Sequence, residues 1–373
     1  MRLAWQNILH DRARFSTTVL GVSFAAFLMV FQGSLLAGFL CAASRFIDAS
    51  DFDIWITARG VQAFEFGAPL EARLQDLAAG VPGVTETSRA CMAFAVFRKL
   101  NGKQQVVALV GADSNIGKRF PVPELAERRA DVSPQSVIYD ESDRPVLETV
   151  SLPARVEING QRATVDHEIQ GFGGFLGVPA LFTSYRNASR YLGLDPERQG
   201  MFILARVANG YSATDVQRRL RERLPEVDVF TREEFARKSR WYWVIKTGAG
   251  SAILTAAILG FFIGLVVVSQ TIYANTMENI EEYATLKALG ASRGFVARIL
   301  VVESLICGAA GSTLGMFAVI PAMQYAKSLI PWIQTPWWLP IITIALSLLM
   351  CSLAAIASVR TSLAIDPGRV FRA

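Results

Sequence analysis

Four long runs without a charged residue divide the chain. In order, they are Ser16–Ser44, Thr247–Met277, Ser304–Ala326 and Ser328–Val359. A helix that crosses the hydrocarbon core of a bilayer needs about 20 apolar residues, and every run is long enough. The pattern therefore predicts four membrane-spanning helices. The alternative, buried helices in a large soluble protein, explains runs of this length poorly.

The spacing of these runs predicts how the chain is organised. The expected fold class is a membrane protein with a bundle of four transmembrane helices and a large α/β extracytoplasmic domain between helices one and two. The predicted segments are a cytoplasmic amphipathic segment at 1–14, helix one at 15–44, the periplasmic domain at 45–246, helix two at 247–275, a cytoplasmic helix and turn at 276–292, helix three at 293–323, an outer loop at 324–336, helix four at 337–359 and a cytoplasmic tail at 360–373.

The first run is expected to remain in the membrane rather than to be cleaved as a signal peptide. Its apolar length is about twice that of the hydrophobic region of a signal peptide. The residues before Cys41 also do not form a lipoprotein cleavage signal.

The distribution of Lys and Arg predicts the orientation. The N-terminal flank, the segment 276–298 and the C-terminal tail each carry three of these residues, whereas the loop before helix four carries only Lys327. Cytoplasmic loops carry the positive excess, so we expect both termini and the segment 276–298 to be cytoplasmic. Five of the seven tryptophans agree, because they precede helix two or helix four at the expected outer interface: Trp241, Trp243, Trp332, Trp337 and Trp338.

The outer domain contains two similar stretches. DFDIWITA and MFILARVA each precede a helical pattern, a Pro turn and a second strand. Each stretch therefore predicts a βαβ unit, and we expect the two to form one α/β subdomain from about 50–100 and 200–235. The residues from about 100 to 195 form a β-rich insert, in which GFGGFLG at Gly171 does not fit a dinucleotide motif and predicts a flexible loop.

Composition limits the chemistry. The chain is 52% hydrophobic and 18% charged, and it contains only two histidines, His10 and His167. Cys91 is the only cysteine of the outer domain, so no internal disulfide and no zinc spacing is expected there. The net charge of +5 lies mostly in the cytoplasmic flanks and does not indicate nucleic-acid binding. We therefore assign no catalytic residue and no metal site.

Small residues interrupt the apolar runs. Gly260 and Gly264 form a GxxxG pattern in helix two, and Gly311 and Gly315 form another in helix three. Such glycines allow helices to approach closely in lipid. The pattern leaves two alternatives open: packing within one subunit, or a homodimer contact.

The helices carry no charge near their centres. Glu303 comes closest, about one turn inside the predicted helix three, from where it can reach the cytoplasmic surface. An ion-driven carrier normally needs a charged relay at mid-membrane, so the energy for any transport is expected to come from elsewhere.

TMENIEEYATLKALGASRGFV, from Thr276 to Val296, is a charged segment between two apolar runs. Its apolar residues recur at helical spacing, Gly290 suits a helix C-terminus, and Ser292 suits the N-cap of the next helix. The segment is expected to be a short cytoplasmic helix and a turn. Its pattern alone fits a docking surface for a soluble partner and an ordinary solvated loop equally well.

A family resemblance bears on that choice. The run GFFIGLVVVSQTIYANTMENIEEYATLKALG, and EYATLKA above all, resembles the permeases of the heterocyst glycolipid exporter (DevC) type. The N-terminal LAWQNILHDRARFSTTVLGVSFAAFLMVFQGSLL and the C-terminal IDPGRVF resemble the same family. More broadly, the plan is similar to the FtsX and macrolide-exporter permease superfamily, which Ala291-Ser292-Arg293 matches better than the DevC pattern.

This resemblance implies a homodimer of permease subunits, each served by a cytoplasmic ABC ATPase that binds ATP and magnesium; this chain itself binds no cofactor. The resemblance also implies a periplasmic membrane-fusion adaptor and an outer-membrane channel as partners. The segment 276–292 would be the coupling helix. By position, its ATPase contacts would be Glu278, Glu281, Glu282, Tyr283, Leu286, Lys287 and Arg293.

The sequence thus predicts a multi-pass inner-membrane permease subunit without catalytic activity. It would couple ATP hydrolysis on a separate ATPase to movement of its periplasmic domain and to export of a lipid-like or other amphipathic substrate. The alternative is an FtsX-like signalling protein that activates a periplasmic enzyme. The large outer domain and the DevC-like run favour export over signalling.

Overall fold

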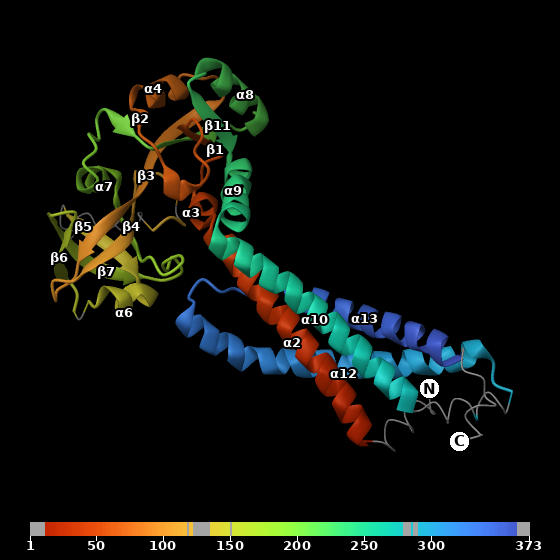
Figure 1. The fold of residues 1–373 in the computed structure, drawn as a ribbon. Coiled ribbons are helices and arrows are strands. Elements are labelled where there is room, and N and C mark those ends of the chain that lie inside the picture. The colour runs from red at the N-terminus through yellow and green to blue at the C-terminus, as the bar shows by residue number, and fades with distance from the viewer. Residues whose placement is uncertain are drawn as a thin grey trace. The chain divides into compact units, whose positions relative to one another are not determined.

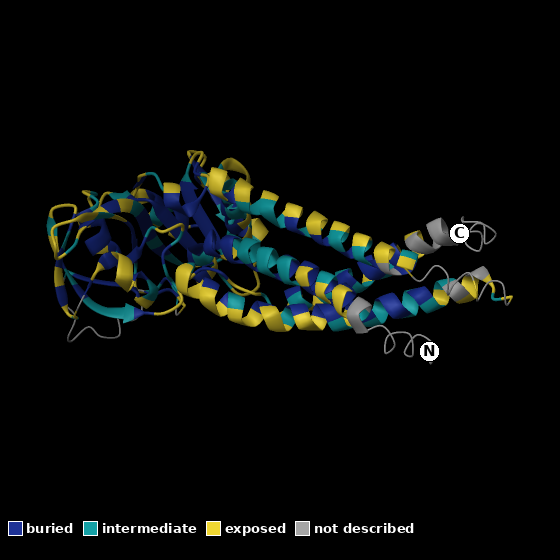
Figure 2. Cartoon of the chain, turned by 60° about the horizontal axis from the view of Figure 1, so that its bottom comes forward, coloured by how far each residue is buried: buried dark blue, intermediate teal, exposed yellow. Residues whose placement is uncertain are grey.

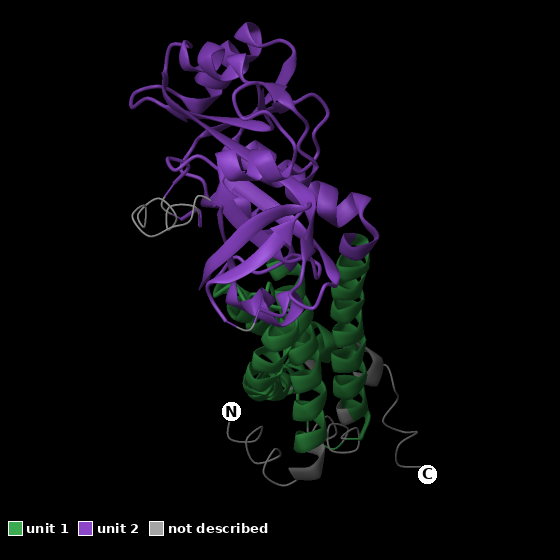
Figure 3. Cartoon of the chain, turned by 90° about the vertical axis from the view of Figure 1, so that its left-hand side faces the viewer, with its two compact units in different colours: residues 1–38, 251–373 green, residues 39–250 purple. Residues whose placement is uncertain are grey.

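The computed structural model describes residues 12–117, 119–121, 135–149, 151–278, 285 and 290–363. The chain divides into two compact units, which Figure 3 colours separately. Residues 1–38 and 251–373 belong to the first, which we call the membrane unit. Residues 39–250 form the second, which we call the α/β unit.

Four helices among the described residues are long and apolar enough to cross a membrane. They are α2 (Arg12–Ala42), α10 (Gly248–Glu278), α12 (Arg293–Leu329) and α13 (Trp338–Leu363), labelled in Figure 1. The α/β unit lies in the sequence between the first and the second of them. The predicted fold class is therefore confirmed.

Helix α12 is longer than expected. It ends at Leu329, so residues 324–329, which we assigned to an outer loop, are helical, and the connection to α13 spans 330–337. The extension is reasonable because no breaker follows Pro321 until Pro331, and Lys327 in the last turn suits the negative end of the helix dipole. The assignment of 324–329 to the loop was wrong.

One sheet of nine strands forms the centre of the α/β unit. The strand order is β11-β1-β10-β3-β4-β8-β5-β7-β6. The bounds are β1 Ile54–Ala58, β3 Val84–Arg98, β4 Gln104–Ala112, β5 Ser136–Asp140, β6 Ala154–Ile158, β7 Gln161–Ile169, β8 Ala180–Ser184, β10 Phe202–Val207 and β11 Val227–Thr231. A short separate ladder joins β2 (Leu70–Glu71) to β9 (Gln199–Gly200).

The two βαβ stretches interleave within this sheet. They are β1, α4 (Arg73–Ala79) and β3, and β10, α8 (Ala213–Arg223) and β11. Strand β10 lies between β1 and β3 and is antiparallel to both, while β11 pairs antiparallel with the other edge of β1. Because side chains alternate along a strand, Ile54 and Ile56 face a core shared with α4 and α8, whereas Trp55 lies in the other core.

The 15-residue strand β3 joins this subdomain to the residues after it. Its first half pairs with β10 and its second half, from Ala90 to Arg98, pairs with β4. The region from about 100 to 195 therefore continues the same sheet instead of forming a separate one. Helix α7 (Tyr185–Tyr191) packs against β4 so closely that a Cβ atom at Gly111 would lie 2.2 Å from that of Ala188.

Helix α2 is the centre of the membrane unit. Its residues contribute to two apolar clusters, one shared with α10 and α13 and the other with α12 and α13. In the most apolar window of each span, 44% of α2 is buried but only 17% of α10. In Figure 2, exposed residues, coloured yellow, recur along the helices, as is expected for surfaces that face lipid rather than water.

Candidate functional site

The predicted coupling segment lies at the end of α10. Glu278 is the last residue of α10 and is exposed, and Arg293 is the first residue of α12. Ser292 is the N-cap of α12, with its Oγ accepting a hydrogen bond from the backbone N–H of Phe295 (3.3 Å). The remaining predicted contacts lie outside the described residues: Glu281, Glu282, Tyr283, Leu286 and Lys287.

The two glycines of the GxxxG pattern in α10 pack on α2. A Cβ atom at Gly264 would lie 3.3 Å from the Cβ of Ala25, and one at Gly260 would lie 3.1 Å from the Cγ of Gln32. Their small size therefore allows α10 to approach α2 within one subunit.

The two glycines of the GxxxG pattern in α12 pack on α2 more tightly. A Cβ atom at Gly311 would lie 2.6 Å from the Cβ of Val22, and one at Gly315 would lie 2.6 Å from the carbonyl oxygen of Ser23. Both distances are shorter than any ordinary contact, so a larger residue would force the helices apart. All four predicted glycines thus serve packing inside the membrane unit.

Glu303 lies deeper in α12 than the sequence suggested. The helix begins at Arg293, as predicted, and Glu303 lies about 15 Å along it, nearly three turns from its start and not about one turn. The side chain is only 6% exposed. A buried acidic residue in a spanning helix is costly and is commonly functional, so Glu303 joins the candidate residues.

The second candidate region lies within the α/β unit, where the chain arrives from α2 and departs toward α10. Helix α3 (Arg45–Ala49) follows α2, and α9 (Arg232–Trp241) is followed by a π-helix, Tyr242–Lys246. We call residues 43–50 and 232–246 the root of the α/β unit.

Hydrogen bonds join the two halves of the root. The hydroxyl of Ser239 donates to the carbonyl oxygen of Ala43 at 2.7 Å, and both groups are buried. The guanidinium of Arg240 donates to the hydroxyl of Ser44 (2.7 Å) and to the carboxylate of Asp48 (2.8 Å). The arriving and departing segments are therefore tied to each other.

A capping box fixes the start of α9. The hydroxyl of Thr231 accepts from the backbone N–H of Glu234 (3.2 Å), and the Glu234 carboxylate accepts from the backbone N–H of Thr231 (3.0 Å). The sequence T-R-E-E at 231–234 is a recognisable signal for this motif, and it would have located α9.

Glu65 is a buried carboxyl beside the root. It accepts a hydrogen bond from the indole N–H of Trp243 at 3.0 Å, and the neighbouring Phe66 ring stacks on Trp243. Burial raises the pKa of the Glu65 carboxyl to about 7, while the bond from Trp243 opposes this rise. The sequence gave no signal for this contact, because the two residues are far apart in the chain.

The glycine-rich loop at 171–177 is held in place by hydrogen bonds. The buried carboxylate of Asp143 accepts from the backbone N–H groups of Gly174 (2.9 Å) and Ala180 (3.1 Å). Burial raises the pKa of Asp143 to about 6, and these two hydrogen bonds oppose the shift. Arg45 of the root donates to the carbonyl oxygen of Gly173 at 3.2 Å. The loop that we expected to be flexible thus has defined partners.

Candidate catalytic chemistry is sparse in the described part of the chain. No group of three or more His, Cys, Asp or Glu side chains there could hold a metal ion. The four cysteines are free thiols, and burial raises the pKa of Cys91 to about 12, which keeps it protonated.

Comparison with known proteins bears on the membrane unit. Residues 254–367 match the sequence model of the family described as FtsX-like permease C-terminal. Residues 254–367 therefore resemble an FtsX-like permease. No curated protein matches the chain. The FtsX-like part includes the four packing glycines, Glu303 and the predicted coupling segment, so the superfamily resemblance is confirmed there.

Two solved structures are similar to part of the chain. One is the periplasmic region of MacB from Actinobacillus actinomycetemcomitans, at 11% identity and a TM-score of 0.37, covering 50% of this chain and 92% of that one. The other is the extracellular domain of the noncanonic ABC-type transporter YknZ from Gram-positive bacteria, at 12% identity and a TM-score of 0.33, covering 48% and 98%.

Proposed function

We propose that this chain is the permease subunit of an ABC-type exporter, of the DevC type within the FtsX-like permeases. A separate cytoplasmic ATPase would bind ATP and magnesium, and the chain would convert the motion of that ATPase into movement of the α/β unit. The observation that carries the proposal is the FtsX-like match over residues 254–367, which contains the predicted coupling segment. The chain is thus a transport subunit and not an enzyme.

The coupling surface is the segment 276–292 with the start of α12. Its acidic residues and its apolar residues at helical spacing suit a groove on a soluble partner. We place the ATPase contacts at Glu278, Glu281, Glu282, Tyr283, Leu286, Lys287 and Arg293. Both chain termini would then lie on the same cytoplasmic side of the inner membrane.

The root supports transmission of motion to the α/β unit. Both chain connections to the spans pass through it, and Ser239 and Arg240 bind them to each other. A displacement of α2 or α10 would therefore act on the α/β unit as a whole and not on one strand of it. The moving unit would engage a periplasmic adaptor that leads to an outer-membrane channel.

Helix α10, the span with the smallest buried share, suggests a second copy of the chain as a partner. Large apolar side chains on α10 are exposed, and they include Ile258, Leu259, Phe262, Ile263 and Val266. Helices in lipid associate through close packing, and we propose that two permease subunits form the exporter. An amphipathic, lipid-like molecule is the substrate class that the DevC resemblance supports.

The proposal is tested by ATP hydrolysis in lipid with the co-purifying ATPase. The variant Glu282→Arg/Leu286→Asp should lose both ATPase binding and the change in its activity, because it reverses a charge and removes an apolar contact. Glu226→Arg/Leu100→Asp makes the same chemical changes at exposed positions of the α/β unit and should retain both. If the native chain neither binds nor alters any ATPase from its source, the exporter function is wrong.

A further inference from the structure

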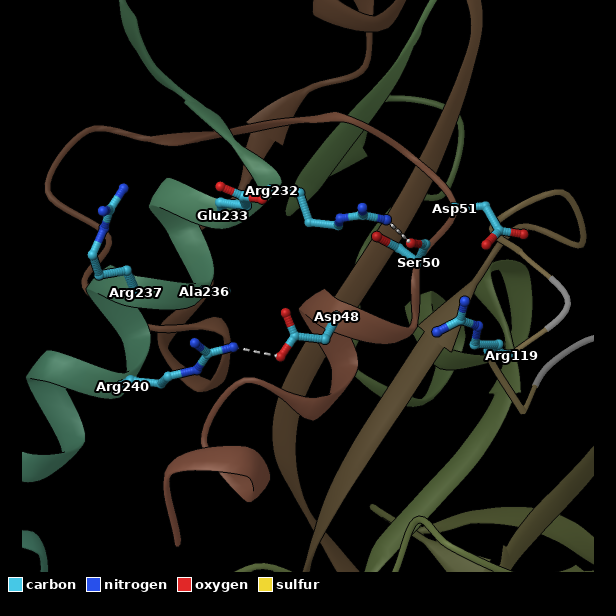
Figure 4. A pocket seen from close by; sticks show the side chains of 9 residues that line it. All are labelled: Asp48, Ser50, Asp51, Arg119, Arg232, Glu233, Ala236, Arg237 and Arg240. Carbon is cyan, nitrogen blue, oxygen red and sulfur yellow. Dashed lines mark hydrogen bonds and ion pairs between the residues drawn. The ribbon is translucent and has the colours of Figure 1, made fainter. Parts of the chain in front are cut away.

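A charged pocket adjoins the root of the α/β unit, between α3, α9 and the loop after β4. Its volume is about 450 Å³. Figure 4 shows its lining, which is rich in arginine and acidic residues: Asp48, Ser50, Asp51, Arg119, Arg232, Glu233, Ala236, Arg237 and Arg240.

Two arginines of the pocket are available to a ligand. Among the lining residues there is one ion pair, between Arg240 and Asp48 (2.8 Å). The side chains of Arg119 and Arg237 are exposed and have no hydrogen bond or ion pair with any residue that the structure describes. An arginine that is left unpaired beside a cavity can bind an anion without first breaking a protein contact.

The rest of the pocket is a fixed frame. Arg240 is held by Ser44 and Asp48, and Arg232 donates to the carbonyl oxygen of Ser50 at 2.9 Å. In Figure 4, Arg232 and Arg240 extend from α9 toward Ser50 and Asp48, and Arg119 lies on the other side of these residues. A frame that is ordered before binding lowers the entropic cost of holding a ligand.

The pocket is close in the chain to two membrane spans. Asp48 is six residues after Ala42, the end of α2, a stretch of at most about 20 Å. On the other side, Trp241 ends α9 only seven residues before α10 begins, and its ring is 64% exposed. Exposed tryptophans are typical of the membrane interface, where the phosphate groups of lipids lie.

We propose that this pocket binds the phosphate group of a phospholipid headgroup from the adjoining leaflet. Guanidinium groups are the preferred partners of phosphate because they offer several N–H donors in one plane. Four arginines and three carboxylates line the cavity, which leaves one excess positive charge, equal to the single negative charge of a phosphodiester. Glu233, which is exposed, adds an acceptor for the amine of an aminophospholipid. This site does not depend on the transport function.

Native mass spectrometry of the full-length chain in maltoside detergent tests the site. The probes are phosphatidylethanolamine, phosphatidylglycerol and diacylglycerol, which lacks the phosphate. We expect both phospholipids to be retained, with the apparent Kd weakened about tenfold in Arg119→Gln/Arg237→Gln, equivalent to about 1.4 kcal/mol. The control Arg186→Gln/Arg223→Gln removes two exposed arginines outside the pocket and should bind as the native chain does.

Three results would overturn the proposal. Diacylglycerol retained as well as the phospholipids would show that the phosphate is not recognised. An equal loss of phospholipid binding in the control variant would show that the effect comes from the overall positive charge of the chain and not from the pocket. A lower apparent Kd for inorganic phosphate than for either phospholipid would keep an anion site but reject a lipid as its occupant.

Discussion

The hydroxyl of Ser239 donates a buried hydrogen bond to the carbonyl oxygen of Ala43, 196 residues earlier in the chain. This contact joins the segment that leaves α2 to the helix that leads into α10. Its loss should act on stability and on coupling, and the two effects can be measured separately.

Ser239→Ala should lower the free energy of unfolding of the α/β unit by about 1–3 kcal/mol, because the carbonyl oxygen of Ala43 loses its buried partner. Thermal unfolding of the full chain in detergent, followed by tryptophan fluorescence, measures this change. The control Ser114→Ala removes an exposed hydroxyl outside the helices and should change little. The same Ser239 variant should still bind the ATPase but alter its activity less, and equal coupling to that of the native chain would refute the role of the root.

Gly311→Ala should destabilise the membrane unit by about 1–3 kcal/mol, because the new methyl group meets Val22 across the contact with α2. Gly294, near the start of α12, has no atom within 4 Å of the position of a Cβ, so Gly294→Ala is the matched control. Thermal aggregation in the same detergent measures the melting temperature of each variant. Equal melting temperatures would mean that α12 does not pack on α2 as described.

Glu65 should make stability depend on pH. The folded-state pKa of about 7 exceeds the ordinary 4.5, so the folded state binds the extra proton. The stability that protonation of Glu65 contributes is therefore complete below about pH 4.5, and it is lost as pH rises through about 7. Glu65→Gln should gain up to about 3 kcal/mol relative to the native chain between pH 5 and pH 8. Urea unfolding of both chains at pH 5 and pH 8 measures this change. If the free energies of unfolding of the variant and the native chain differ by the same amount at both pH values, the raised pKa of Glu65 is wrong.

Asp143→Ala should release the loop at 171–177. The change leaves the buried N–H groups of Gly174 and Ala180 without their acceptor, at a cost of about 2–3 kcal/mol. Hydrogen exchange of these two amides should accelerate together. Glu141→Ala removes an exposed carboxylate nearby and should leave both amides protected, which separates the loss of the acceptor from a change in charge.

The sequence predicted the features that depend on local pattern. Charge-free runs located all four spans, and strand and helix patterns located β1, α4, α8 and β11. The glycines of α10 and α12 were also recognised, but periodicity does not name the helix that faces them, so α2 as their common partner required the structure.

The remaining features depend on contacts between distant residues. No sequence pattern predicts these contacts, because hydrogen-bond partners and pocket walls are set by tertiary packing. They are Ser239 with Ala43, Trp243 with Glu65, and Arg119 beside α9. The coupling contacts at 281–287 lie outside the described residues and stay predictions.

The π-helix at Tyr242–Lys246 separates α9 from α10. Thr247 follows it in an extended conformation, with φ −109° and ψ 146°, and its hydroxyl accepts from the backbone N–H of Gly250 at 3.1 Å. The two helices are therefore not one rigid shaft. The chain can change direction at Thr247 without breaking a backbone hydrogen bond inside α9 or α10.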